Sequence, residues 1–104
     1  MKEWKKVCQH SELAEGTCKS ITLFNKSVAV FNVAGQLYAM ENECPHRGGA
    51  LSEGTFKGKI VTCPWHSWRF DVTTGTFESD DSITLPMFPV KVEADEVLVE
   101  VTVS

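Results

Sequence analysis

Two short stretches of this chain contain the residue types that most often bind metal ions. The first, NECPHRGGALSEG, begins at Asn42 and contains Cys44 and His46. The second, TCPWHSWRFD, contains Cys63 and His66, and sixteen residues separate the two pairs. Two thiols and two imidazoles could bind one zinc ion, bind an iron–sulfur cluster, or lie in a core as ordinary residues. Because both pairs occur in stretches rich in glycine and proline, a purely structural role fits them poorly.

The pairing of one cysteine with one histidine in each stretch distinguishes between the two metals. Zinc fingers usually pair cysteine with cysteine and place two histidines on a following helix, and no helical period is present here. A [2Fe–2S] cluster of mixed ligation fits better, because one iron takes two thiolates and the other takes two imidazoles. Two ferric irons, two sulfides and two thiolates carry no net charge, so this cluster accepts an electron more readily than one with four thiolates. A structural zinc-binding module is the less favoured alternative.

The combined pattern CPHRGG…CPWHSWRFD resembles the Rieske iron–sulfur signature, and specifically that of the small soluble Rieske ferredoxins. The glycine pair after the first histidine and the RFD-x-x-T-G run after the second also fit. The resemblance covers essentially the whole chain. It implies one [2Fe–2S] cluster per chain, with the inner iron bound by Cys44 and Cys63 and the outer iron by His46 and His66.

The positions around the cluster predict a low midpoint potential. High-potential respiratory Rieske proteins have one more cysteine in each loop, and these form a disulfide; the matching residues here are Gly49 and Trp65. Those proteins also have a serine and a tyrosine whose hydroxyls donate hydrogen bonds to cluster sulfurs, at positions occupied here by Trp68 and Phe70. Fewer donors stabilise the reduced cluster less. The resemblance further implies that Leu85–Pro89 is a proline loop covering the cluster, although a kink at the entry to a strand is an alternative.

The elements that must position these stretches are short β-strands. β-Branched and aromatic residues recur in SITLF, SVAVFNV and QLYAM, which are separated by turn residues and predict a three-stranded meander over residues 20–40. Near the end of the chain, FPVKVEADEVLVEVTV predicts two strands around the turn Ala94–Asp95–Glu96. Short strands at this spacing predict an all-β antiparallel sandwich or barrel. The Rieske fold that the resemblance implies is of this class.

The length of 104 residues predicts a single Rieske domain, residues 1–104, because it leaves no room for a second core. Residues 42–75 contain five of the seven glycines and two prolines. We interpret this region as a cluster-binding subdomain inserted in a base β domain. It would consist of two loops carried on hairpins and joined through a strand near Lys59–Thr62.

Charge and composition limit the partners. The net charge of −4 argues against nucleic acid, whose phosphates require clustered Lys and Arg. Residues 71–104 contain eight acidic residues and one basic residue, which indicates a solvated acidic surface or a docking surface. No signal peptide and no membrane span are predicted, so we expect a cytoplasmic protein without a membrane partner. In that reducing compartment, cysteines bind metal more readily than they form disulfides.

The remaining candidate residues predict no second site. We expect Cys8 and Cys18 to be free, mostly buried thiols, with a disulfide between them as the alternative. His10 is expected at the surface. The acidic residues Glu78, Asp80 and Asp81 are expected in a solvated turn. Trp4, Tyr38 and the phenylalanines are assigned to the core.

The sequence predicts an electron carrier and not an enzyme. Once His46 and His66 bind the cluster, only His10 remains, so the two-histidine, one-carboxylate iron site of an oxygenase cannot be built. There is no dinucleotide fingerprint and no nucleophile with an adjacent base. The resemblance implies a ferredoxin that carries one electron from an NAD(P)H-dependent flavoprotein reductase to a terminal oxygenase, in particular a ring-hydroxylating one. The alternative is the Rieske-type small subunit of an NAD(P)H-dependent nitrite reductase, bound to its large subunit.

Overall fold

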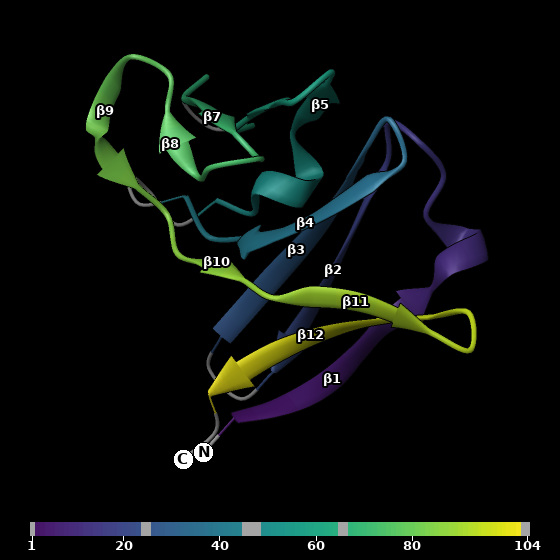
Figure 1. The fold of residues 1–104 in the computed structure, drawn as a ribbon. Helices are drawn as coiled ribbons and strands as arrows, with labels where there is room; N and C mark the ends of the chain where they lie inside the picture. The colour runs from purple at the N-terminus through teal and green to yellow at the C-terminus, as the bar shows by residue number, and fades with distance from the viewer. Residues whose placement is uncertain (1, 24–25, 45–48, 65–66, 103–104) are drawn as a thin grey trace.

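The computed structural model describes residues 2–23, 26–44, 49–64 and 67–102, and most of these residues lie in antiparallel β-sheets (Figure 1). Two one-turn 3₁₀ helices, η1 (His10–Glu12) and η2 (Leu51–Glu53), complete the regular structure of these residues. None of the described helices is long and apolar enough to cross a membrane. The predicted all-β class is confirmed.

Three sheets are stacked in the molecule, as Figure 1 shows from bottom to top. The first has the order β1 (Lys2–Gln9), β12 (Glu96–Thr102), β11 (Val90–Glu93). The second has the order β10 (Met87–Phe88), β4 (Gln36–Glu41), β3 (Lys26–Val33), β2 (Cys18–Leu23). The third has the order β5 (Thr55–Lys57), β6 (Ile60–Thr62), β7 (Arg69–Asp71), β8 (Thr76–Phe77), β9 (Asp80–Thr84).

Both predicted strand groups are present. The meander is β2–β3–β4, and its pairing runs without a register shift from Cys18 opposite Phe31 to Val33 opposite Gln36. The C-terminal hairpin is β11–β12. Its turn has two residues and not three, with Ala94 and Asp95 at φ of +49° and +64°. A two-residue turn with both φ values positive matches the right-handed twist of the strands that it joins.

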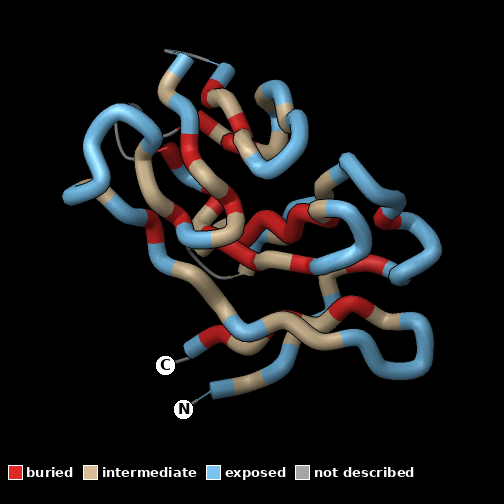
Figure 2. Tube along the Cα trace, turned by 45° about the horizontal axis from the view of Figure 1, so that its top comes forward, coloured by how far each residue is buried: buried red, intermediate tan, exposed pale blue. Residues whose placement is uncertain are grey.

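β3 lies in the second sheet, which is the middle layer of the stack. Its residues from Val28 to Asn32 are all buried, which requires a cover on both faces of the strand because successive side chains point in opposite directions. Val28 and Val30 pack in a cluster with valines of β12, whereas Ala29 and Phe31 pack in a second cluster with residues of the third sheet. Figure 2 shows the buried positions gathered along these inner strands, with the exposed positions at the turns. The second of these clusters contains Cys44 and Cys63.

The assignment of Trp4 to the core is wrong. Trp4 is 38% exposed, since it lies opposite Glu100 on the outward face of the β1–β12–β11 sheet. The ammonium of Lys91 lies 4.3 Å from the ring centroid, so a cation–π contact covers part of the indole from the solvent side. Phe31 and Phe70 are fully buried as predicted, whereas Phe56, Phe77 and Phe88 are partly buried and pack against the core clusters. Tyr38 is partly buried.

Candidate metal centre

The first cysteine lies in a hairpin that is closed by a short ladder of backbone contacts. The amide of Leu51 donates to the Asn42 carbonyl at 2.7 Å, and Glu43 and Ala50 form an antiparallel bridge. Next in the ladder, the amide of Cys44 donates to the Gly49 carbonyl at 2.8 Å. Cys44 and Gly49 therefore lie opposite each other on the two sides of the hairpin, and the Cys44 side chain is buried with 1% exposure.

The second cysteine has an equivalent position on the hairpin β6–β7. The amide of Cys63 donates to the Trp68 carbonyl at 2.7 Å, and the Cys63 carbonyl accepts from Ser67 at 3.2 Å. Cys63 is also 1% exposed. In both hairpins, then, the cysteine amide donates to the carbonyl of the residue five positions later. The repeated Cys-Pro pattern of the sequence therefore corresponds to a repeated backbone contact.

The two hairpins are in direct contact. Gly54, which follows η2, has an ordinary φ of −87°, but a Cβ atom there would overlap the carbonyl oxygen of Thr62 and lie 3.1 Å from Cδ of Pro64. The first hairpin therefore packs backbone to backbone against the residues that flank Cys63. The structure thus brings Cys44 and Cys63 into one core.

The two predicted histidine ligands, His46 and His66, lie outside the described residues. Within residues 2–23, 26–44, 49–64 and 67–102, no group of three or more His, Cys, Asp or Glu side chains is placed to hold a metal ion. The two thiols are therefore the part of the predicted ligand set whose position the structure gives.

The surroundings of these thiols fit an iron–sulfur cluster. Cys44 and Cys63 share an apolar cluster with Leu51, Val61 and Phe70, and isolated thiolates would be costly in such a place. Iron bound to both thiolates would neutralise their charge, and the apolar shell would keep water from the sulfurs. The donor set and the dry environment therefore agree with a cluster whose thiolate-bound iron lies inward.

The other two cysteines are placed as predicted. Cys8 is buried and Cys18 is partly buried, and both are free thiols. Burial raises the pKa of both thiols, so they remain protonated at neutral pH and are poor metal ligands. Cys18 donates a weak hydrogen bond to the Ser52 carbonyl at 3.6 Å. His10 is exposed in η1, also as predicted.

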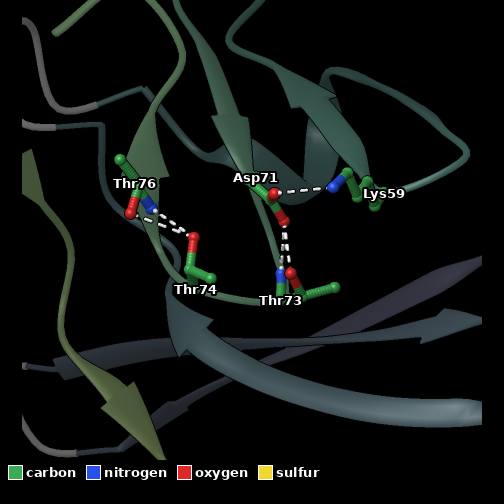
Figure 3. A network of polar contacts seen from close by, with 5 residues as sticks. All are labelled: Lys59, Asp71, Thr73, Thr74 and Thr76. Atoms are coloured by element: carbon green, nitrogen blue, oxygen red, sulfur yellow. Dashed lines mark hydrogen bonds and ion pairs between the residues drawn. The ribbon is translucent and has the colours of Figure 1, made fainter. Parts of the chain in front are cut away.

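The RFD-x-x-T-G run forms the turn that supports the second hairpin (Figure 3). One carboxylate oxygen of Asp71 accepts from the amide and the hydroxyl of Thr73 at 2.9 and 2.6 Å, and the other lies 3.3 Å from the Lys59 ammonium. Burial raises the pKa of Asp71, but the hydrogen bonds from Thr73 and the ion pair with Lys59 together outweigh it, so the pKa is lowered. Asp71 is therefore ionised at neutral pH and fixes the connection between β7 and β8.

The segment Leu85–Pro89 contacts the same region. Leu85 is 7% exposed and packs in the cluster that contains both cysteines, and Met87–Phe88 form β10 on the edge of the second sheet. A Cβ atom at Gly75, whose φ is +80°, would lie 2.5 Å from the Leu85 carbonyl oxygen. The segment is thus a strand entry that also packs beside the cysteine core. Its role as a cover of the cluster stays a prediction.

Aromatic side chains lie beside Cys63 where hydroxyl donors were predicted to be missing. The indole of Trp68 stacks on Phe77 with the ring centroids 4.2 Å apart and the planes at 13°. Phe70 completes the group, 5.4 Å from Phe77. These rings add apolar area close to the thiolate side of the core.

Two residues that support the site have no clear signal in the sequence. Asn42 is buried with 4% exposure and uses both its backbone and its amide to join the first hairpin to β3. Gly54 is required by close packing and not by its φ, so it looks like any turn glycine. A polar residue directly after an apolar strand is the one available hint for Asn42.

Comparison with known proteins agrees with this geometry. Residues 3–89 match the family described as "Rieske [2Fe-2S] domain". The chain is 38% identical over 98 residues to "Ferredoxin CarAc" of Metapseudomonas resinovorans, covering 92% of each chain. It is 31% identical over 101 residues to "Naphthalene 1,2-dioxygenase system, ferredoxin component" of Pseudomonas aeruginosa, covering 96% of this chain and 97% of the relative.

A solved structure extends the similarity to three dimensions. A chain in the "Complex of reduced oxygenase and oxidized ferredoxin in carbazole 1,9a-dioxygenase" superposes with a TM-score of 0.85 at 38% identity, covering 92% of this chain and 91% of that one. The family match covers well over half of the sequence, and both curated relatives are matched over almost their full length. The chain therefore belongs to the Rieske [2Fe-2S] domain family and carries one [2Fe–2S] cluster.

Proposed function

We propose that this chain is a Rieske ferredoxin, a one-electron carrier between an NAD(P)H-dependent flavoprotein reductase and a terminal oxygenase of the ring-hydroxylating type. The observation that carries the proposal is the near full-length similarity to a ferredoxin, to the ferredoxin component of a naphthalene dioxygenase system, and to a chain in a solved complex of an oxygenase with its ferredoxin. We place it in the cytoplasm, where a reducing environment keeps the cysteines available as ligands.

The proposed ligands are Cys44, His46, Cys63 and His66. The bound cluster would supply one-electron redox chemistry near the surface. The chain's own contribution is to bury the two thiolates in an apolar core and to hold the two hairpins together at Gly54. A rigid, dry thiolate side limits the rearrangement that accompanies each change of charge.

A reconstituted system tests this proposal. The purified chain would be combined with a ferredoxin-dependent flavoprotein reductase, NADH and a ring-hydroxylating oxygenase, and hydroxylated product would be measured against ferredoxin concentration. We expect product formation to require this chain and to be lost with Cys63→Ser, whereas Cys8→Ser should support the wild-type rate. Equal product formation with and without the chain would contradict the proposal.

The same preparation separates the carrier from the fixed subunit. A free carrier should elute alone from a size-exclusion column and be reduced by catalytic amounts of reductase. A chain that copurifies in a constant ratio with a sirohaem enzyme, and does not support the oxygenase, would instead be the small subunit of a nitrite reductase.

A further inference from the structure

Asn42 lies where three segments of the chain meet, directly before the first cysteine hairpin. Its side-chain NH₂ donates to the Ser27 hydroxyl of β3 at 3.0 Å, and its side-chain oxygen accepts from the amide of Ser52 at 2.8 Å. Its backbone repeats both connections, because its N–H donates to the Ser27 carbonyl at 2.9 Å and its carbonyl accepts from Leu51 at 2.7 Å. The residue therefore binds the entry of the hairpin, the exit of the hairpin and the central sheet at once.

The position of these bonds matters because Cys44 is two residues away. The hairpin that contains Cys44 begins at Asn42 and ends at η2, so the amide of Asn42 fixes both of its ends. η2 in turn contacts β2, β5 and β6, and β6 leads to Cys63. Asn42 is thus the point at which the first hairpin is attached to the layers that carry the second.

We propose that Asn42 is a positioning residue for the cluster, whose side-chain amide keeps the Cys44 hairpin closed and so governs how long the cluster is retained. The inference rests on the proposed function only in taking Cys44 as a ligand. Release of the cluster requires local opening of a ligand loop, and such openings are governed by the bonds that close the loop. Removal of the amide would leave the Ser52 N–H and the Ser27 hydroxyl without these partners in a part-buried place.

The size of the effect follows from two part-buried hydrogen bonds. Each contributes about 0.5–1.5 kcal/mol, and a factor of ten corresponds to about 1.4 kcal/mol. Asn42→Ala should therefore speed cluster release by about tenfold to a hundredfold. Asn42→Asp should restore retention, because a carboxylate still accepts from Ser52 and the Ser27 hydroxyl can turn to donate to it.

The chain offers a matched control in Asn32. It is also 4% exposed, and its amide also makes one donated and one accepted hydrogen bond, to the Leu13 carbonyl and from the Gly35 amide, both at 2.8 Å. Leu13 packs in the other core cluster, the one without Cys44 and Cys63. Asn32→Ala should therefore lower global stability about as much as Asn42→Ala while leaving cluster release within about threefold of the wild type.

The experiment measures the loss of visible absorbance in excess iron chelator under native conditions, together with the urea midpoint of each variant. The EPR spectrum of the reduced protein is recorded as a signature of ligand geometry, which should change in Asn42→Ala and not in Asn32→Ala. Similar release rates for the two alanine variants, at similar urea midpoints, would overturn the proposal. If Asn42→Ala does not fold, Ser27→Ala provides the milder test, with an expected increase of about threefold to tenfold from one lost hydrogen bond.

Failure of the proposed role of Asn42 and failure of the proposed function give different results. If the wild type retains its cluster and Cys44→Ser does not, but Asn42→Ala releases the cluster at the same rate as Asn32→Ala, only the proposed role of Asn42 is wrong. If Cys44→Ser retains the full cluster, the ligand assignment is wrong and the inference fails with it. In the double variant, Ser27→Ala should add little to Asn42→Ala, because both changes break the same bond.

Discussion

Replacement of Gly54 by alanine tests the contact between the two cysteine hairpins. The added Cβ atom would overlap the Thr62 carbonyl oxygen and lie 3.0 Å from the Thr62 carbonyl carbon and 3.1 Å from Cδ of Pro64. Two of these atoms belong to backbone that precedes Cys63, so a rotamer change cannot relieve the overlap. The hairpins must separate, which loosens the core on the thiolate side.

The expected cost of Gly54→Ala is about 3 kcal/mol, at the upper end of the range for overpacking, since the clashing atoms are mainly backbone. For a domain of about this size, each kcal/mol lowers Tm by about 4–8 °C, so the predicted decrease is about 12–24 °C. Scanning calorimetry of the protein as purified measures it, and iron and acid-labile sulfide are assayed on the same sample. We expect the iron content to fall as well.

Gly58→Ala is the matched control, on the turn at the other end of β5. Gly58 has a φ of +63°, and nothing lies within 4 Å of the added Cβ atom, so only the left-handed backbone conformation is penalised. That penalty is about 1–2 kcal/mol, partly offset by the stiffer unfolded chain, so we expect a net loss of about 1 kcal/mol and full iron content. A Tm for Gly54→Ala within a few degrees of that for Gly58→Ala would refute the close approach of the two hairpins.

Three further predictions concern charge, potential and docking. Asp71→Asn should lower the free energy of unfolding by about 1 kcal/mol at neutral pH. Because the pKa of Asp71 is lower in the folded protein, this loss is fully present above the pKa of the unfolded chain, about 3.9, and disappears as the pH falls through the folded-state pKa. Urea titrations of both proteins at several pH values measure it. The midpoint potential, measured by voltammetry, should lie near the lower end of the roughly −150 to +300 mV Rieske range, and Phe70→Tyr should raise it if the new hydroxyl points inward. A wild-type value well above about +100 mV would contradict the argument that the cluster lacks hydroxyl hydrogen-bond donors. Trp65→Ala should slow both reduction by the reductase and delivery to the oxygenase at an unchanged potential, and unaltered rates would show that partners dock elsewhere.

The sequence was most informative where the pattern follows the pleat of a strand. Alternation of Val97, Val99 and Val101 with more polar residues predicts one buried face, and all three valines are buried on β12. The Cys–His spacing was equally informative, because the ligand preferences of a mixed [2Fe–2S] cluster leave few alternatives. The division of the chain into a base domain and a subdomain over residues 42–75 stays a prediction.

Other features depend on contacts between residues far apart in the chain, which a local pattern does not contain. Trp4 was assigned to the core by residue type, yet it lies opposite Glu100 on the face of the sheet that points away from the buried valines of β12. The residues of the run Val28–Asn32 are all buried because a sheet lies on each side of β3. The sequence of the run does not alternate strictly between apolar and polar residues, and it gives no sign of the two covering sheets. Gly54 packs against the backbone of Thr62, and Asn42 forms hydrogen bonds with Ser27 and Ser52. Only the folded chain brings these residues together.

The most direct test of the central claim is pulsed EPR of the reduced protein labelled with ¹⁵N-histidine. A cluster bound by two thiolates and two imidazoles should show hyperfine coupling to two histidine nitrogens and one unpaired electron per chain. One coupling should disappear in each of His46→Ala and His66→Ala where a paramagnetic centre remains, and both should persist in His10→Ala. Absence of histidine coupling in the wild type, or its loss in His10→Ala, would contradict the account.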